Sequence, residues 1–506
     1  MRISDVGSTP TRGAQPRRCD ITRSEQAESE QVTAIVLAAG AGTRMKSAHA
    51  KVLHEVGGRS MIEHALRAVS GAGASTLVAV VGHERDQVSA AIDAFSSTVI
   101  HAVQENQRGT GHAVQIALDA LDEAPTGTVL VTYGDVPLLS SETLAELLVD
   151  HRAAGRAVTI LTAELDDPTG YGRILRNEAG DVTAIREDKD ATDEQRAVRE
   201  INSGIVAVEA AFLVDAIKRL ESNNAQGELY LTDIAGLAFD EGRPVGAHLL
   251  EDVWQTEGVN DRAQLARLGR ELNRRQTQHW MSEGVTIVDP ETTWIDSAVT
   301  LAPDVTLMPG TQLLGATVVA EGATIGPDTT LRNVEVGANA TVIRTHGSDA
   351  VIGADATVGP FAYLRPGTEL GTKGKIGAFV ETKNAHIGDG AKVPHLSYVG
   401  DAEIGEGTNI GAGTIFANYD GVNKHRTTVG KHARTASNNT FVAPVEIGDG
   451  AHTGAGTTVR KDIPPGALAV SKGEQRNIEG WVEQNRPDTT SAQAARDAKK
   501  DDSDGE

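Results

Sequence analysis

Apolar residues recur at every sixth position through much of the second half of the sequence. The first run comprises Ile295, Leu301, Leu307, Leu313, Val319, Ile325 and Leu331. The second run comprises Ile352, Val358, Leu364, Leu370 and Ile376. This period fits neither a helix nor a long alternating strand, but it fits short parallel strands that stack as a β-helix. Three six-residue units make one turn of such a coil, which buries its apolar residues against the turns above and below. The second half is therefore predicted to form a β-helix.

One stretch, residues 418–426, interrupts this rhythm. An insertion in a solenoid projects as a loop, and such loops often reach a ligand or a neighbouring chain. The 54 glycines and the aromatic content of only 3% agree with frequent turns and an aliphatic core. The repeat alone leaves open whether the coil carries an active site or serves only as a scaffold.

Strand-like and helical patterns alternate in the first half of the chain. Val32–Val36, Leu77–Val81 and Thr128–Tyr133 are apolar runs typical of buried strands. Ser60–Glu63 reads as a capping box that opens a helix, and Gly71 can close that helix. Such alternation predicts a parallel sheet covered by helices, with ligands bound at the carboxyl ends of the strands.

These patterns divide the chain into five segments. Residues 32–260 form the strand and helix half, and residues 261–283 carry leucines at helical spacing, which predicts an amphipathic connecting helix. Residues 284–481 hold the repeat. Residues 1–31 and 482–506 are rich in polar and charged side chains, so both ends are expected to be disordered tails.

Charge and cysteine content narrow the possible partners. The formal charge of -23 argues against nucleic acid or an anionic membrane as the main partner. The single cysteine, Cys19, excludes an internal disulfide framework. No apolar run has the length of a signal core or a membrane span. We therefore expect a protein of the reducing cytoplasmic compartment.

A loop of small residues follows the first predicted strand. Leu37–Met45 contains Gly40 and Gly42, and Lys51 comes a few residues later. Small residues let backbone N–H groups approach a phosphate, while Arg44 and Lys51 can offset the charge of a triphosphate. An ordinary turn from strand to helix would explain the glycines alone. The whole run, however, resembles the signature of sugar-nucleotide pyrophosphorylases.

Two further stretches extend this resemblance. Gln104–Ala113 is similar to the loop that grips the uracil base in these enzymes, where an amide offers both a donor and an acceptor. Tyr133–Pro137 places Asp135 at the end of a predicted strand. A carboxylate there suits Mg²⁺, which prefers oxygen ligands and keeps most of its waters. Without the resemblance, a carboxylate that caps the following turn would explain Asp135 equally well.

Later motifs resemble the N-acetylglucosamine-1-phosphate uridyltransferase branch of this family. They are Pro168–Arg173, Arg186–Thr192, Glu200–Gly204 and Asn224–Asp233. The resemblance implies that Gly172, Glu187 and Asn202 hold the sugar, that Asp135 and Asn260 hold Mg²⁺, and that Arg44 and Lys51 are catalytic. The substrate-binding residues that it implies are Leu37, Ala38, Ala39, Gly40, Lys51, Gln104, Gly109, Thr110, Tyr133, Gly134, Asp135, Gly172, Glu187, Asn202 and Asn260.

In the second half, His395 is a candidate general base. Arg365 and Lys383 stand on neighbouring turns by the six-residue count, and two cations near a histidine suit a sugar phosphate. These motifs resemble glucosamine-1-phosphate acetyltransferases, whose repeat forms a left-handed β-helix and assembles as a homotrimer. The resemblance places Arg365, Lys383, Tyr398 and Asn409 on the substrate and His395 as the base. It places acetyl-CoA on Ala412, Asn418, Tyr419, Ser437, Ala455 and Lys472.

From Val32 to Trp481 the chain thus resembles the bacterial family that joins both activities. This resemblance implies an α/β fold, with a Rossmann-like nucleotidyltransferase domain joined by a helix to the β-helix. It implies acetylation of glucosamine 1-phosphate, then transfer of UMP from UTP to N-acetylglucosamine 1-phosphate, a supply route for cell-wall synthesis. Two alternatives remain open here. One is a sugar-phosphate nucleotidyltransferase with a structural or regulatory β-helix, and the other is a non-enzymatic subunit of the translation-initiation exchange-factor class.

Overall fold

The computed structural model describes residues 31–471, 475 and 477–503 of the 506-residue chain. The chain divides into two compact units, with the boundary in the sequence between Arg275 and Gln276. The predicted N-terminal tail lies outside the described residues except for Gln31. Every helix in the described part is too short or too polar to cross a lipid bilayer.

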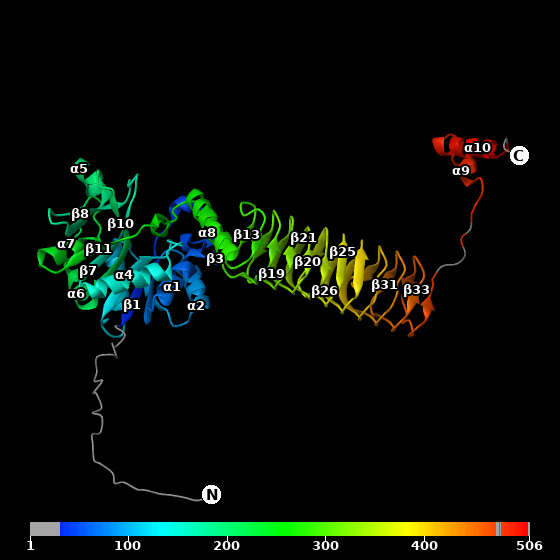
Figure 1. The fold of residues 1–506 in the computed structure, drawn as a ribbon, viewed down its shortest axis with the longest axis horizontal. Helices are drawn as coiled ribbons and strands as arrows, with labels where there is room; N and C mark the ends of the chain where they lie inside the picture. Colours follow the sequence, from blue (N-terminus) through cyan, green and yellow to red (C-terminus); the bar gives the residue numbers. More distant parts are fainter. Residues whose placement is uncertain (1–30, 472–474, 476, 504–506) are drawn as a thin grey trace, which may run out of the picture. The chain divides into compact units, whose positions relative to one another are not determined.

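The first unit is built on one sheet (Figure 1). Clusters of buried apolar side chains cover both faces of this sheet. The main path of the sheet runs in the order β11, β7, β10, β6, β1, β4 and β5. These strands are β1 (Val32–Leu37), β4 (Thr76–Val81), β5 (Ile100–Val103), β6 (Thr128–Tyr133), β7 (Val158–Glu164), β10 (Glu200–Glu209) and β11 (Val245–Leu249). The runs that predicted strands in this half therefore form β1, β4 and β6.

Residues of β1 alternate between two helical layers. Ile35 and Leu37 pack with one layer, and Ala34 and Val36 pack with the other. The first layer contains α3 (Thr110–Asp119), α6 (Ala210–Ala216) and α7 (Asp233–Asp240), and the second contains α1 (Met61–Gly71), α2 (Arg85–Phe95) and α4 (Ser141–Ala153). Helix α1 begins where the sequence predicted, because the Glu63 backbone N–H donates to the Ser60 hydroxyl at 3.3 Å.

The sheet is mixed, whereas the sequence predicted a wholly parallel sheet. Strands β5, β4, β1 and β6 are parallel, as are β7 and β11, but β10 runs antiparallel to both β6 and β7. The hairpin of β8 (Gly172–Arg176) and β9 (Val182–Arg186) extends beside β10. Strand β8 is antiparallel to both β9 and β10, so β9 and β10 both run against the direction of β6 and β7. The short helix α5 (Asp193–Arg196) lies between β9 and β10 in the chain.

The second unit is a coil of short parallel strands, as the period of six predicted. Strand β13 (Trp294–Ile295) pairs with β16 (Gln312–Leu314), β14 (Thr300–Leu301) with β17 (Val318–Val319), and β15 (Thr306–Leu307) with β18 (Thr324–Ile325). Each pairing joins residues three six-residue units apart, so one turn of the coil takes three units and has three faces. All residues of the two apolar runs are buried in one continuous core.

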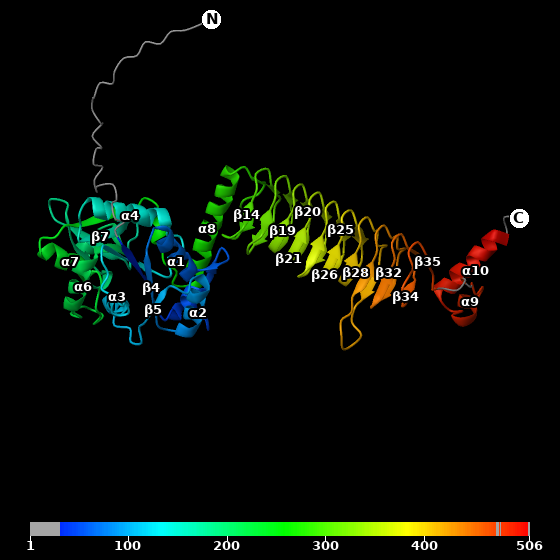
Figure 2. The same ribbon diagram turned by 90° about the horizontal axis from the view of Figure 1, so that it is seen from below.

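The stretch that interrupts the repeat forms a loop. It lies between β29 (Ile415–Ala417) and β30 (Thr427–Val429), and in Figure 2 it hangs away from the coil as the long orange loop. Its Val422 side chain is 82% exposed. The loop is braced internally by Asp420, whose carboxylate accepts from the backbone N–H groups of Val422 and Asn423 at 2.8 and 2.7 Å.

Helix α8 (Arg262–Ser282) occupies the segment predicted to be an amphipathic helix. Leu268 packs with Met45 and Val259 of the first unit, and Trp280 packs against the core of the coil. The C-terminal segment differs from the disordered tail expected over residues 482–506. It contains α9 (Trp481–Asn485) and α10 (Thr490–Ser503), which contact each other and bury Ala492, because the alanines and alternating charges of this stretch favour a helix.

Candidate functional site

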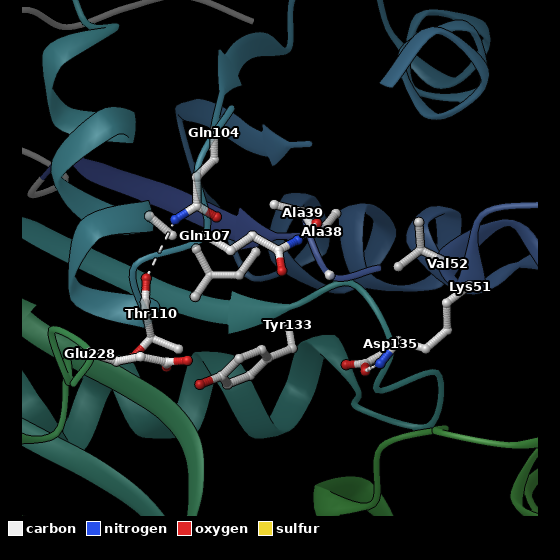
Figure 3. A pocket seen from close by; sticks show the side chains of 14 residues that line it. Ala38, Ala39, Lys51, Val52, Gln104, Gln107, Thr110, Tyr133, Asp135 and Glu228 are labelled. Carbon is white, nitrogen blue, oxygen red and sulfur yellow. Dashed lines mark hydrogen bonds and ion pairs between the residues drawn. The ribbon is translucent and has the colours of Figure 1, made fainter. Parts of the chain in front are cut away.

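A cavity of about 300 Å³ opens at the carboxyl ends of β1 and β6 (Figure 3). It is lined by ten residues that the sequence assigned to substrate: Leu37, Ala38, Ala39, Gly40, Lys51, Gln104, Gly109, Thr110, Tyr133 and Asp135. The other lining residues are Val52, Gln107, Ala113 and Glu228. Loops far apart in the sequence thus meet at the edge of the sheet where ligands were expected.

At one end of this cavity Lys51 forms an ion pair with Asp135, as Figure 3 shows. Both side chains are largely buried, with 14% and 17% of their surface exposed. Gly42 has a φ of 57°, and a Cβ there would lie 2.5 Å from that of Lys51, so the loop reaches Lys51 only because this residue is glycine. The small residues of the loop and the Lys51 ammonium make this the end suited to phosphate groups.

Asn260 and Arg44 lie beside this ion pair. The Arg44 guanidinium donates to the Asn260 side-chain oxygen at 2.9 Å, and the Val259 backbone N–H donates to the Asp135 carbonyl oxygen at 2.9 Å. Neither Arg44 nor Asn260 lines the cavity itself. Two oxygen donors, the Asp135 carboxylate and the Asn260 amide, are therefore brought together, and each is paired with a cationic side chain.

The opposite end of the cavity is formed by the loop that begins at Gln104. Gln104 is 5% exposed, and its side-chain amide N–H group donates to His112 Nδ1 at 3.1 Å. Among the described residues, the hydrogen bonds of this amide involve its nitrogen and not its oxygen. Gly109 has a φ of 103°, and a Cβ there would meet the Leu229 carbonyl oxygen at 2.5 Å. Glycine is therefore required for the loop to close against residues 228–229.

The three residues predicted to hold the sugar lie together although they do not line the cavity. Gly172 pairs with Asn202 across β8 and β10, and a Cβ on Gly172 would lie 3.5 Å from a Glu187 carboxylate oxygen. The Thr232 hydroxyl donates to Glu187 at 3.2 Å. Burial raises the pKa of Glu187, and the neighbouring carboxylate of Asp233 raises it further.

Tyr133 lines the cavity and also lies near Glu187, one of the residues predicted to hold the sugar. Its pKa is raised chiefly by burial and also by the nearby carboxylates of Glu187 and Asp135. Gly134, the next residue, packs beneath the cavity, where a Cβ would lie 3.0 Å from Ile62. The sequence had assigned Gly134 to substrate, but it lies under the lining rather than in it.

Four lining residues were not assigned from the sequence. Val52 follows Lys51, and Gln107 and Ala113 lie within the Gln104–Ala113 motif, so their positions beside assigned residues were the available signal. The Gln107 amide donates to the Ala39 carbonyl oxygen at 2.5 Å and so closes one wall. Glu228 lies within the Asn224–Asp233 motif, and its neighbour Leu229 brings it to the cavity by exchanging backbone hydrogen bonds with Arg108 and Gly111.

In the coil, the candidate substrate cations share one face. Arg365 follows β23 (Ala362–Leu364), Lys383 lies in β26 (Glu381–Ile387) and Tyr398 begins β28 (Tyr398–Ile404). These strands pair in register, so the three side chains stand on successive turns. Arg365 donates to Glu381 at 2.9 Å. The Lys424 ammonium beside Lys383 lowers the pKa of Lys383. Two neighbouring cationic side chains are the arrangement expected at an anion-binding site.

His395 ends β27 (Lys392–His395), at the corner that leads to this face. Its side chain is exposed, and Tyr398 begins the next strand. Asn409, in contrast, pairs with Lys392 and Arg434 on the neighbouring face. The chain by itself therefore does not bring Asn409 together with Arg365 and Lys383.

The residues assigned to acetyl-CoA fall in two places. Ala412 and Ser437 lie along the same corner as the candidate base His395, because the carbonyl oxygens of His395, Ala412 and Ser437 accept from Gly413, Asn438 and Gly456 on the next turn of the coil. Ala455 precedes Gly456. Asn418 and Tyr419 instead begin the interrupting loop, where Asn418 donates to Asp401. Lys472 lies outside the described residues.

Comparison with known proteins covers both units. The chain is 58% identical over 465 residues to the bifunctional protein GlmU of Corynebacterium efficiens, across 91% of this chain and 96% of that protein. It is 60% identical over 466 residues to the bifunctional protein GlmU of Pseudarthrobacter chlorophenolicus, across 92% and 95% of the two chains. Residues 34–201 also match the MobA-like NTP transferase domain. This chain therefore belongs to the family of bifunctional GlmU proteins.

Proposed function

We propose that this protein is a bifunctional enzyme of UDP-N-acetylglucosamine synthesis. The second unit transfers the acetyl group of acetyl-CoA to the amine of glucosamine 1-phosphate. The first unit transfers UMP from UTP to N-acetylglucosamine 1-phosphate and releases pyrophosphate. The observation that carries this proposal is the identity of about three residues in five to bifunctional relatives over nearly the whole chain.

Uridylyl transfer begins with attack of the sugar-phosphate oxygen on the α-phosphorus of UTP, and the bond to the pyrophosphate oxygen breaks. Lys51 and Arg44 supply positive charge at the phosphate end, where negative charge develops on the leaving group. Gln104 faces the base end, and Glu187 and Asn202 face the sugar end beyond Tyr133. Most of the catalysis is then positioning and electrostatic stabilisation.

Asp135 and Asn260 fit the divalent cation that this chemistry uses. Their oxygens lie at the phosphate end, and each already attracts a cationic side chain, Lys51 and Arg44 respectively. Among the described residues no group of three or more His, Cys, Asp or Glu side chains is arranged to hold a metal ion, so phosphate oxygens and water would complete the coordination. Bound Mg²⁺ would neutralise charge on the triphosphate.

Acetyl transfer follows from the residues of the coil. Arg365 and Lys383 bind the phosphate of the sugar, and His395 takes a proton from the amine as its nitrogen attacks the thioester carbonyl carbon. The carbon–sulfur bond then breaks, the amide forms, and the coenzyme A thiolate regains a proton from His395. Ala412, Ser437 and Ala455 mark the corner along which acetyl-CoA would lie.

We also propose that the protein acts as a homotrimer in the cytoplasm. Phe361, Phe379 and Leu396 occupy successive turns at one corner of the coil, and they are 53%, 60% and 61% exposed. All three adopt a positive φ, which costs non-glycine residues about 1 kcal/mol each. An exposed apolar column beside His395 suits contact with a second copy, which would also bring Asn409 of that copy to the site. The number of subunits is the one that the resemblance to glucosamine-1-phosphate acetyltransferases implies.

The two reactions should separate by mutation. Asp135→Ala should abolish uridylyl transfer and leave acetyl transfer at the level of the unaltered protein, and His395→Ala should do the reverse. Release of coenzyme A from acetyl-CoA with glucosamine 1-phosphate measures the second reaction, and release of pyrophosphate measures the first. Loss of both reactions in a folded Asp135→Ala or His395→Ala protein would refute the two-site proposal. Absence of any acetyl transfer by the unaltered protein would leave a uridyltransferase with a structural coil.

A further inference from the structure

Arg173 in β8 is an arginine with almost no contact with solvent. Its side chain is 2% exposed, and no other lysine or arginine among the described residues is buried to this degree. A guanidinium removed from water destabilises the fold unless several acceptors surround it. Because Arg173 is buried beside the residues proposed to hold the sugar, its guanidinium requires hydrogen-bond acceptors at specific positions there.

Three different segments supply those partners. The Arg173 guanidinium donates to the Tyr171 carbonyl oxygen at the entry to β8, to the Asp188 carboxylate at 3.2 Å, and to the Arg196 carbonyl oxygen at 3.4 Å. Arg196, at the end of α5 (Asp193–Arg196), also donates from Nε to the Asp188 carbonyl oxygen at 3.2 Å. Arg173, Asp188 and Arg196 thus form a closed ring of hydrogen bonds.

This ring lies directly behind the residues proposed to hold the sugar. Asp188 follows Glu187, and Gly172 precedes Arg173. Across the sheet Arg173 pairs with Arg186, which precedes Glu187, and with Ile201, which precedes Asn202. Arg173 is therefore bonded to, or paired with, a sequence neighbour of each of the three residues proposed to hold the sugar. Its own side chain makes its hydrogen bonds within the ring and not with those three side chains.

We propose that Arg173 is a positioning residue that holds Glu187 in register with Gly172 and Asn202, and so sets the affinity for the sugar phosphate. This inference rests on the proposed role of those three residues in uridylyl transfer. Asp188 and Tyr171 are otherwise loop residues: Gly170 has a φ of 86°, and Asp188 begins a single turn of 3₁₀-helix. The paired register of β8 and β9 ends at Arg173 and Arg186. The bonds of the guanidinium to Tyr171 and Asp188 extend the connection between the two segments beyond that pair, to the neighbours of Gly172 and Glu187.

The test uses the full-length protein with Arg173→Gln and Arg173→Lys. Arg176→Gln is the matched control, because Arg176 lies on the same strand and makes a two-bond ion pair with Glu200 at 2.8 and 2.7 Å, but its side chain is 38% exposed. The KM for N-acetylglucosamine 1-phosphate, the KM for UTP and kcat are measured separately. Acetyl transfer by the same samples reports on the second unit, and Glu187→Gln tests the sugar site directly.

Arg173→Gln should raise the KM for the sugar phosphate about tenfold and change the KM for UTP by less than about twofold. Arg173→Lys should fall between it and the unaltered protein, since a lysine keeps the charge but not the fork of donors. General destabilisation would instead lower the active fraction and hence kcat, with both KM values unchanged. That result, or equal rises in both KM values, or the same effect in Arg176→Gln, would overturn the inference.

Glu187→Gln separates this inference from the proposed site. If Glu187→Gln raises the KM for the sugar phosphate and the Arg173 variants do not, the positioning role is wrong and the sugar site stands. If Glu187→Gln leaves that KM unchanged, the sugar site itself is wrong. Should Arg173→Gln fail to fold, Arg173→Lys decides the question, because it retains a cation at the same position.

Discussion

Tyr133 lies against the backbone of Gly204, which leaves room for the ring only because it lacks a side chain. Gly204 has a φ of 83°, and a Cβ there would collide with the Tyr133 ring. The carboxylates of Glu187 and Asp135 are both close enough to the buried Tyr133 hydroxyl to raise its pKa, although burial is the larger cause. The packed neighbours of a residue in this unit therefore set its properties. The pKa of Glu187, which its surroundings raise, is the clearest case.

The affinity for N-acetylglucosamine 1-phosphate should depend on the charge of Glu187. Burial and nearby carboxylates raise the pKa of Glu187 above its ordinary value, so its neutral form persists to a higher pH than in an exposed glutamate. Only the charged form accepts hydrogen bonds at both oxygens. The KM for the sugar phosphate should therefore fall as the pH rises through this raised pKa, and rise as the pH drops below it.

Measured KM values between about pH 5 and pH 8 check this expectation, a range in which a raised carboxyl pKa becomes visible. Glu187→Gln is the control, because glutamine does not titrate, while the phosphate of the substrate titrates equally with both proteins. An identical pH profile in the variant would assign the dependence to the substrate rather than to Glu187.

The coil derives its stability from stacking one turn on the next. Phe416 in β29 and Phe441 in β31 (Thr440–Val442) are fully buried and meet edge to face, with ring centroids 5.1 Å apart. They are unusual in a core made almost wholly of aliphatic side chains. Since each turn touches only its neighbours, damage at this pair should be felt near the turns that carry the proposed acetyl-CoA residues.

Phe441→Ala should destabilise the coil by about 3 to 5 kcal/mol, the range for truncating a buried aromatic side chain. In a urea series, acetyl transfer should be lost at a lower concentration than in the unaltered protein, while uridylyl transfer keeps its own profile. Val351→Ala, at a 41% exposed outer position of the coil, is the control and should change neither profile. An equal shift of both activities would contradict independent stability of the two units.

The assembled protein depends on surfaces that one chain leaves uncovered. Phe361 and Phe379 stack with their centroids 5.3 Å apart at an angle of 9°, yet more than half of each side chain is exposed. They lie along the same corner as His395, whereas Asn409 lies on a different face from Arg365 and Lys383. A site formed between copies would account for both observations.

Phe379→Asp should therefore shift the protein from trimer to monomer in analytical ultracentrifugation. Acetyl transfer should fall by at least about tenfold, because a charge in the contact destabilises it and the site is incomplete without a neighbour. Uridylyl transfer should be retained. Val318→Asp, at a 42% exposed position on another face, is the matched control. A variant at Phe379 with the mass of the unaltered protein and full acetyl transfer would exclude this corner as the contact.

Local patterns of the sequence were enough to predict much of the fold. The period of six predicted the coil because each apolar position is repeated at the same place in every turn, and strand pairing follows that period. The apolar runs at Val32, Leu77 and Thr128 predicted three strands of the first sheet. The reversed direction of β10 was not predicted, because the local sequence of a strand does not indicate its direction in the sheet. The helices α9 and α10 were not predicted, because a polar composition is also typical of disordered segments.

The candidate site shows the same division. Gly40, Lys51, Gln104 and Asp135 could be assigned from the sequence. Each belongs to a short motif whose residue types and spacing can be recognised without the fold. Residues that enter through contact between distant segments could not. Glu228 reaches the cavity through backbone bonds of Leu229, Arg173 gains its acceptors from three different segments, and Asn409 lies on another face of the coil. Spacing along the chain determines periodicity and local turns, whereas long-range packing determines which of these turns meet.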